Sequence, residues 1–113
     1  MSSHYKIGKY QPIDLIEKLN LSFNVGNVVK YIYRYPFKDG IKDIDKAIYY
    51  LNRVKDKFEL FNFNRTDIRE FLQKNDCLYG TQKEMLWGLY DYAMRGNTDY
   101  LDKVIKLLEK EKE

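Results

Sequence analysis

Two rows of polar side chains that can bind phosphate lie between residues 27 and 57. On a helical wheel with about 100° per residue, the first row lies opposite an apolar stripe, and the second borders the apolar stripe of the next predicted helix. The first row is Asn27, Lys30, Tyr31 and Arg34, and the second is Asp43, Lys46, Tyr50, Arg53 and Lys57. If the two helices pack antiparallel, the rows border one groove.

The residue types in these rows suit an anionic ligand, most simply a nucleotide. Lys and Arg bind phosphate, Arg through its planar fork. Asn27 or Asp43 can contact a base or a sugar hydroxyl, and a tyrosine can stack on the base. Rows of charge on helices more often only face water, so an ordinary solvated face with an Asp43–Lys46 pair is the competing interpretation.

Other chemistry is sparse. His4, the only histidine, lies beside Tyr5 and can serve as a proton shuttle or phosphate donor, or be a terminal surface residue. No G-x-x-x-x-G-K-[ST] motif occurs, which excludes a P-loop kinase. The pairs Asp67/Glu70 and Asp99/Asp102 have a spacing that can hold Mg²⁺, but acids also favour the first turn of a helix.

Composition limits the class of protein. The 113 residues suit a single domain. The net charge is +3, with +4 in residues 1–61 and −1 in residues 62–113, and this asymmetry favours an anionic partner for the first half but is too mild for a DNA-coating protein. Only Cys77 is present, no apolar run approaches roughly 18 residues, and no signal peptide is evident, so we expect a cytoplasmic protein without a membrane partner. Eleven Tyr and six Phe exceed the need of one small core, which predicts a homo-oligomer.

Hydrophobic periodicity predicts an all-α fold. It is built on an antiparallel helix hairpin at about 24–34 and 41–61, with a C-terminal helical subdomain in residues 62–113. Pro12 opens a first helix to about Leu19, and Pro36 and Gly40 form the hairpin turn. Thr66 is expected to cap a fourth helix, the Thr81–Glu84 capping box to start a fifth, and Asn97 or Thr98 to cap a sixth.

Residues 4–54 resemble a small phage domain family. We expect the family-like helical region to extend over residues 4–61. The pattern is His-Tyr near the start, then Ile-Asp, Leu-x-Leu-x-Phe, Gly-Asn-x-x-Lys-Tyr, an Arg, a Lys/Gly turn and Asp-x-x-Lys-Ala-x-x-Tyr-Leu-x-Arg. The residues that carry it are His4, Tyr5, Ile13, Asp14, Leu19, Leu21, Phe23, Gly26, Asn27, Lys30, Tyr31, Arg34, Lys38, Gly40, Asp43, Lys46, Ala47, Tyr50, Leu51 and Arg53. Members are often labelled nucleotide kinases, because one phosphorylates nucleoside monophosphates without a P-loop.

The resemblance implies a phage-encoded nucleotide-binding protein in the host cytoplasm. It is either kinase-like, with Mg²⁺ as a cofactor only if phosphotransfer occurs, or a protein that sequesters a nucleotide signal. The alternative is an anti-defence protein that binds a host protein or a nucleic acid, for which the run Tyr31–Lys38 would suit a single strand. The implied ligand-binding residues are His4, Tyr5, Asn27, Lys30, Tyr31, Arg34, Lys38, Asp43, Lys46, Tyr50 and Arg53. We expect Arg34→Ala to weaken binding and leave the fold intact.

Overall fold

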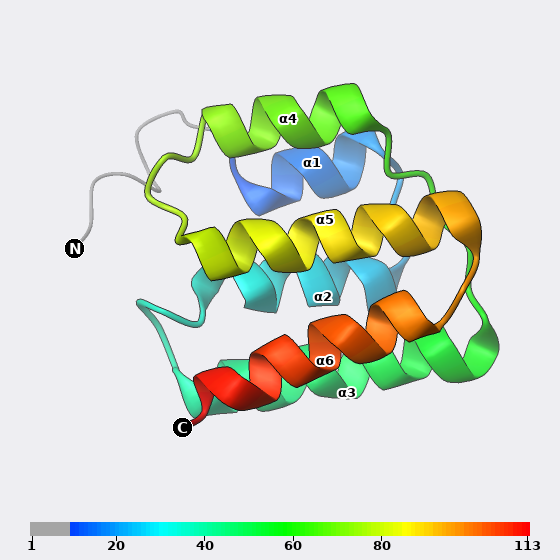
Figure 1. Ribbon diagram of the computed structural model, residues 1–113. Coiled ribbons are helices and arrows are strands. Elements are labelled where there is room, and N and C mark those ends of the chain that lie inside the picture. Colours follow the sequence, from blue (N-terminus) through cyan, green and yellow to red (C-terminus); the bar gives the residue numbers. More distant parts are fainter. Residues whose placement is uncertain (1–9) are drawn as a thin grey trace.

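Six α-helices make up the computed structural model, which describes residues 10–113. No β-strand occurs in this part of the chain, so the predicted all-α class is confirmed. No helix among the described residues is long and apolar enough to cross a membrane. The helices are α1 (Pro12–Lys18), α2 (Phe23–Arg34), α3 (Ile41–Lys57), α4 (Arg65–Gln73), α5 (Gly80–Arg95) and α6 (Asp99–Glu111) (Figure 1).

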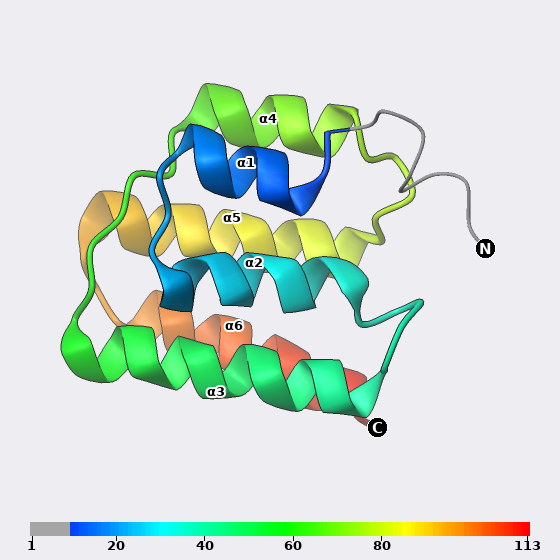
Figure 2. The same cartoon turned by 180° about the vertical axis from the view of Figure 1, so that it is seen from behind.

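The helices form two layers. Helices α1, α2 and α3 lie side by side in one layer, and α4, α5 and α6 cover it from the other side (Figures 1 and 2). Helices α2 and α3 run antiparallel and pack against each other, which confirms the predicted hairpin. Helices α5 and α6 pack on each other and reach back to α2 and α3, so the C-terminal helices complete the core of the hairpin.

Local sequence signals set the ends of the hairpin. The Ser22 hydroxyl accepts a hydrogen bond from Val25 N at 3.2 Å and caps α2, which ends shortly before Pro36. Gly40, with a φ of 52°, precedes α3. The predicted extension of α3 to Phe61 is wrong. Phe58 adopts the left-handed conformation, with a φ of 51°, and the helix ends at Lys57.

The start of α5 also differs from the prediction. The helix begins at Gly80, and the side chain that satisfies its first turn is Gln82, whose Oε1 accepts from Tyr79 N at 2.8 Å. Gln82 is buried, and its Nε2 donates to Ile32 O at 2.8 Å and Tyr33 O at 3.0 Å. Gln82 therefore caps the start of α5 and also donates hydrogen bonds to carbonyl groups at the C-terminal end of α2. The predicted Thr81–Glu84 capping box is not formed.

The other helix starts were predicted to within a few residues. Helix α4 is capped by Asn64 rather than Thr66, since Asn64 Oδ1 accepts from Asp67 N at 2.9 Å. Before α6, Asn97 Oδ1 accepts from Asp99 N at 2.9 Å. At both helix starts, the side-chain oxygen that accepts the backbone N–H belongs to an asparagine that lies one or two residues before the first helical residue.

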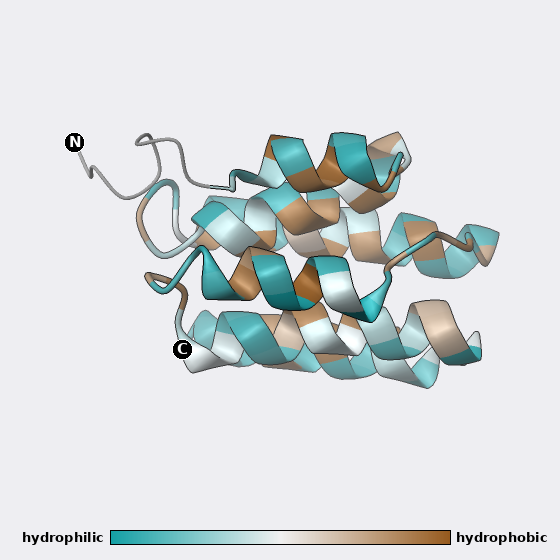
Figure 3. Cartoon of the chain, turned by 90° about the horizontal axis from the view of Figure 1, so that it is seen from above, coloured by the Kyte–Doolittle hydropathy of each residue, from teal (hydrophilic) through white to brown (hydrophobic). Residues whose placement is uncertain are grey.

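The core lies between the two layers. Each helix turns an apolar stripe inward and a polar face outward, so hydrophobic and hydrophilic residues alternate along the ribbon (Figure 3). The largest fully buried side chains are Leu15, Ile32, Leu51, Phe63, Ile68, Phe71, Met85, Leu86, Leu89, Tyr92, Leu101 and Leu108. The inner faces of α2 and α3 pack in this core, and their outer faces remain accessible to solvent and ligands.

Candidate functional site

Arg34 at the end of α2 is held by two carboxylates from the start of α3. Its Nε donates to Asp43 Oδ2 at 3.2 Å, and its Nη2 lies 3.4 Å from Asp39 Oδ2. Asp43 is fully buried, and its Oδ2 also accepts from Asp39 N at 2.9 Å. Asp43 therefore positions Arg34 and the first turn of α3 and is closed to solvent, although the sequence suggested that it contacts a ligand.

Three cations surround the ring of Tyr31. Lys30 Nζ lies 5.0 Å from the ring centroid, Lys46 Nζ 5.4 Å, and Arg34 Cζ 5.7 Å. Arg34 is balanced by its carboxylates, but Lys30 and Lys46 have no ion-pair partner among residues 10–113. The π-face of Tyr31 allows these like charges to gather, and the result is a site of positive potential between α2 and α3.

Tyr50 links this cluster to two more rings. It stacks on Tyr31 with a centroid distance of 6.3 Å and an interplanar angle of 8°. Phe23 and Tyr49 meet Tyr50 edge to face, at centroid distances of 5.7 Å and 5.0 Å. The antiparallel packing of α2 and α3, both of which lie toward the viewer in Figure 2, thus joins the two polar rows predicted from the sequence into one aromatic and basic surface.

A pocket of about 380 Å³ lies between α1 and the C-terminal half of α2. Its apolar wall comes from Pro12, Ile13 and Ile16 of α1 and from Tyr33 and Phe37. Its charged wall carries Lys30, Arg34 and Lys38, and Gln11 completes the lining. The volume falls in the range of small-molecule sites, and an apolar wall facing cations suits a flat ring that carries phosphate.

Lys30 and Arg34 contribute to both features, because they lie on the α2 face between the pocket and the Tyr31 cluster. The hydrogen bonds to Asp43 and Asp39 use Nε and Nη2 of Arg34, which leaves Nη1 for a ligand. The carboxylates also restrict the guanidinium to one position, so its remaining donors are oriented before a ligand arrives. A phosphate in the pocket would therefore meet a fixed Arg34 fork beside the more mobile Lys30.

The remaining predicted site residues divide into three groups. Asn27 bonds within its own helix, with Nδ2 donating to Phe23 O at 2.9 Å. Arg53 lies on the exposed side of α3 without an ion-pair partner in the described part of the chain. His4 and Tyr5 lie outside the described residues.

The run Tyr31–Lys38 does not form the strand-binding surface that its composition suggested. Tyr33 and Tyr35 are buried in the core, with exposed fractions of 3% and 6%. The Tyr35 hydroxyl donates to Glu111 Oε1 at 3.0 Å, and burial together with this hydrogen bond raises the pKa of Tyr35. Of the four aromatic side chains in the run, only Tyr31 and Phe37 are partly exposed, so the rings do not form a continuous surface for stacking bases.

Both carboxylates of the Asp67/Glu70 pair, and Asp102 of the Asp99/Asp102 pair, are engaged by lysines. Lys18 Nζ lies 2.9 Å from Asp67 Oδ1 and 3.6 Å from Glu70 Oε1, and Lys74 also pairs with Glu70. On α6, Lys55 Nζ lies 2.7 Å from Asp102 Oδ1. In the structure these carboxylates join helices to one another, which favours the helix-start interpretation over a Mg²⁺ site.

Sequence reasoning missed most of the pocket. Its apolar wall was read only as the ordinary apolar face of a first helix, and Asp39 only as a turn residue. Which apolar side chains line a cavity depends on how α1 crosses α2, and no local motif encodes that crossing. The one available signal is the concentration of Lys30, Arg34 and Lys38 next to aromatic residues.

Comparison with known proteins gives a family match for the first part of the chain. Residues 1–52 match a protein family described as of unknown function (DUF3310). The match spans α1, α2 and most of α3, the helices that carry the candidate site, and leaves α4, α5 and α6 outside. No curated protein and no solved structure gives a significant match.

Proposed function

We propose that the protein binds a phosphate-bearing small molecule, most simply a nucleotide, in the pocket between α1 and α2. One observation carries the proposal: an apolar wall from Pro12, Ile13 and Ile16 faces Lys30, Arg34 and Lys38 across a volume of about 380 Å³. A base can pack on the apolar wall while its phosphates meet the cations. A charged contact to phosphate contributes about 1.5–3 kcal/mol, so three of them sum to about 4.5–9 kcal/mol, which corresponds to a Kd between roughly 0.5 mM and somewhat below 1 µM.

Binding without turnover is the form of the proposal that the geometry favours. Phosphoryl transfer is normally assisted by Mg²⁺ held by carboxylates, but Asp39 and Asp43 already neutralise Arg34, and Asp14, next to the pocket residue Ile13, accepts a hydrogen bond from Gln11 N at 2.9 Å. A phage-encoded protein of this kind would sequester a nucleotide or a nucleotide signal in the host cytoplasm. A kinase-like activity would require a Mg²⁺ ion.

We further propose that the protein is a homo-oligomer, which would bring the basic faces of several copies together. Light scattering at micromolar concentration measures the oligomeric state.

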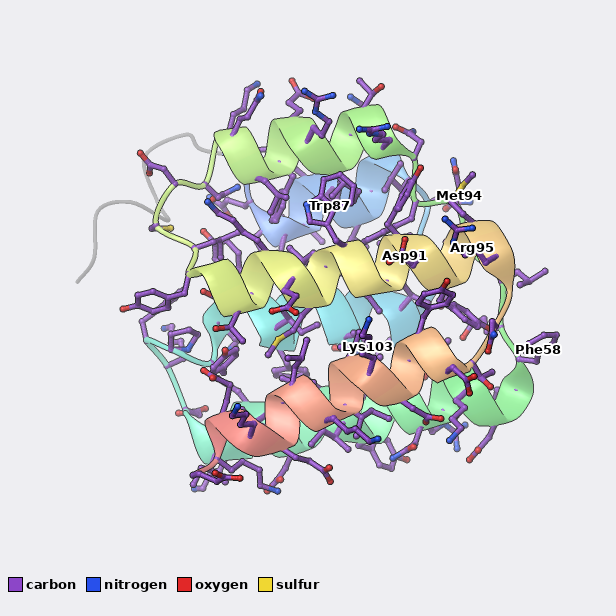
Figure 4. The ribbon with its side chains drawn as sticks, viewed as in Figure 1. Phe58, Trp87, Asp91, Met94, Arg95 and Lys103 are labelled. Carbon is purple, nitrogen blue, oxygen red and sulfur yellow. The ribbon has the colours of Figure 1, made fainter. Side chains whose placement is uncertain are left out.

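A thermal-shift screen of mono-, tri- and cyclic nucleotides, each with and without Mg²⁺, tests the proposal. A ligand at 100 times its Kd stabilises the folded state by about 2.7 kcal/mol, which is a clear rise in Tm. Lys30→Gln and Lys38→Gln are each expected to weaken the best ligand by roughly 10- to 100-fold in calorimetry. Lys103→Gln is the matched control, because Lys103 lies on α6 in the opposite layer (Figure 4).

Two results would contradict the proposal. One is a screen in which no nucleotide raises the Tm of the wild type. The other is a ligand that binds the Lys30→Gln, Lys38→Gln and wild-type proteins equally well, since that ligand would occupy a different site. Transfer of labelled phosphate from a nucleoside triphosphate to a monophosphate, dependent on Mg²⁺, would replace sequestration by the kinase-like alternative.

A further inference from the structure

A row of cations and tyrosines follows the exposed side of α3 along almost its whole length. The members are Lys42, Lys46, Tyr49, Tyr50, Arg53 and Lys57, which fall within about a third of the helix circumference. Their positions span roughly 22 Å at about 1.5 Å per residue. None of the four cations has an ion-pair partner among the residues that the structure describes.

Exposed rings accompany these charges. Phe23 is 75% exposed and Tyr49 57% exposed, and both make edge-to-face contacts with the half-buried Tyr50. The edge contacts fix the two outer rings while leaving ring surface in solvent. Phe23 and the six residues of the row are termed the aromatic–basic face. Exposed rings beside a line of positive charge are the combination that proteins use to hold single-stranded nucleic acid.

The outer face of the opposite layer carries both signs of charge. On the face formed by α5 and α6, Asp91 lies among Arg95 and Lys103, so both signs of charge are mixed (Figure 4). Helix α6 likewise exposes Asp99 and Glu109 among its lysines.

Carboxylates are confined to the borders of the aromatic–basic face. On the wheel of α3, Asp43 flanks the row on one side and Asp45 and Asp56 flank it on the other, and no carboxylate lies within it. Asp43 is buried and bonded to Arg34, and Asp45 pairs with Lys112 at 2.8 Å, so Asp56 is the exposed carboxylate at the edge that has no ion-pair partner among the described residues. The positive potential is therefore concentrated on one side of the molecule.

We propose that the aromatic–basic face binds single-stranded nucleic acid, with the strand lying along α3. Lys42, Lys46, Arg53 and Lys57 contact successive phosphates, and unpaired bases stack on Phe23 and Tyr49. A single strand fits better than a duplex, because the bases of a duplex are already stacked on one another and cannot reach the rings. No residue of this face lines the nucleotide pocket, and binding of a strand does not require a ligand in that pocket.

Fluorescence anisotropy with fluorescein-labelled dT15 tests the inference. Four phosphate contacts predict a slope of log K against log salt near −3, which is a loss of about 50-fold between 50 and 200 mM salt. Phe23→Ala and Tyr49→Ala are each expected to weaken dT15 binding about tenfold, because stacking on one ring contributes roughly that much. Lys46→Gln with Arg53→Gln is expected to make the slope shallower by about 1.4. Circular dichroism and thermal melting verify that each variant folds.

Matched controls separate this surface from the pocket. Lys38→Gln, in the pocket lining and outside the aromatic–basic face, and Lys103→Gln on the opposite layer are expected to leave dT15 binding unchanged. Inorganic polyphosphate of similar charge is expected to bind more weakly than dT15, and its affinity should not respond to Phe23→Ala or Tyr49→Ala. Three results would overturn the inference. They are a complex whose affinity does not depend on salt, equal binding of dT15 by all variants, and no binding of dT15 in about 50 mM salt at about 50 µM protein. The last result would favour a protein partner for this face.

Discussion

Arg34 and Asp43 form an ion pair in which the carboxylate is fully buried, with Nε 3.2 Å from Oδ2. Asp43 Oδ1 is also buried and has no hydrogen-bond partner among the described residues. Arg34 therefore provides the countercharge that allows Asp43 to remain in the interior. Because of this pair, Arg34→Ala is expected to affect the stability of the fold as well as ligand binding.

We predict that Arg34→Ala lowers the free energy of unfolding by about 2–3 kcal/mol, because it leaves a buried carboxylate without its countercharge. Chemical denaturation measures the effect. The double variant Arg34→Ala/Asp43→Ala is expected to be more stable than the sum of the two single losses implies, because neither partner is then left unpaired. Additive losses would show that the pair is not coupled. Loss of ligand binding by Arg34→Ala alone is consequently no proof of a direct contact.

Gln82 is predicted to be one of the most sensitive polar positions. Its side chain makes three hydrogen bonds, to Ile32 O, Tyr33 O and Tyr79 N, and it is buried between α2 and α5. Gln82→Met keeps most of the volume and removes the hydrogen bonds, so we expect a loss of about 2–3 kcal/mol in denaturant unfolding. Gln73→Met, on the exposed end of α4, is the control and should change stability by less than about 0.5 kcal/mol. A small effect at Gln82 would mean that water replaces its hydrogen bonds.

Gly88 allows α5 and α6 to approach closely. A Cβ atom at this position would lie 2.6 Å from Cγ2 of Val104, whose branched side chain cannot rotate away easily. We predict that Gly88→Ala lowers stability by about 1–3 kcal/mol despite the better helix propensity of alanine. Gly80→Ala is the matched control, because a Cβ atom there would point into open space, and it should stabilise by a few tenths to about 1 kcal/mol. In a Val104→Ala background, Gly88→Ala should lower the free energy of unfolding by less than it does in the wild type. An equal loss in both backgrounds would contradict a steric clash with Val104.

Asp67 gives a prediction for pH dependence. The hydrogen bond from Lys18 lowers the pKa of Asp67 and outweighs burial, which raises it. A carboxyl group whose pKa is lower in the folded state stabilises the protein above its unfolded pKa, near about 4, and this contribution is lost as the pH falls through the folded value. We therefore expect the stability difference between wild type and Asp67→Asn to be full at about pH 6 and to shrink between about pH 4 and pH 2. Thermal melts across this range measure it, and a difference that stays constant would show that Lys18 does not act through the charge of Asp67.

The sequence by itself determined the helices and the residues of interest. Periodic apolar stripes specify the all-α class, and Pro36 with Gly40 specifies the turn that makes α2 and α3 antiparallel. Such signals are local, because a helix needs only its own 3.6-residue pattern and its caps. The polar rows could be predicted from the sequence for the same reason. Their members do contact one another in the structure, as shown by Tyr31, Arg34, Asp43, Lys46 and Tyr50.

Only the tertiary structure decided what each member of those rows does. Asp43 lies at the edge of its helix stripe, and the approach of α2 makes it fully buried, whereas Arg53 further along α3 stays exposed. Tyr33 and Tyr35 look like surface aromatics in the sequence, but both are buried. The Tyr33 ring packs on Phe71 of α4 and its hydroxyl donates to Asn75, whereas the Tyr35 hydroxyl donates to Glu111 of α6. The pocket exists because α1 crosses α2 beside Lys30 and Arg34. Burial and cavities arise from contacts between helices far apart in the chain, and no pattern within one helix specifies those contacts.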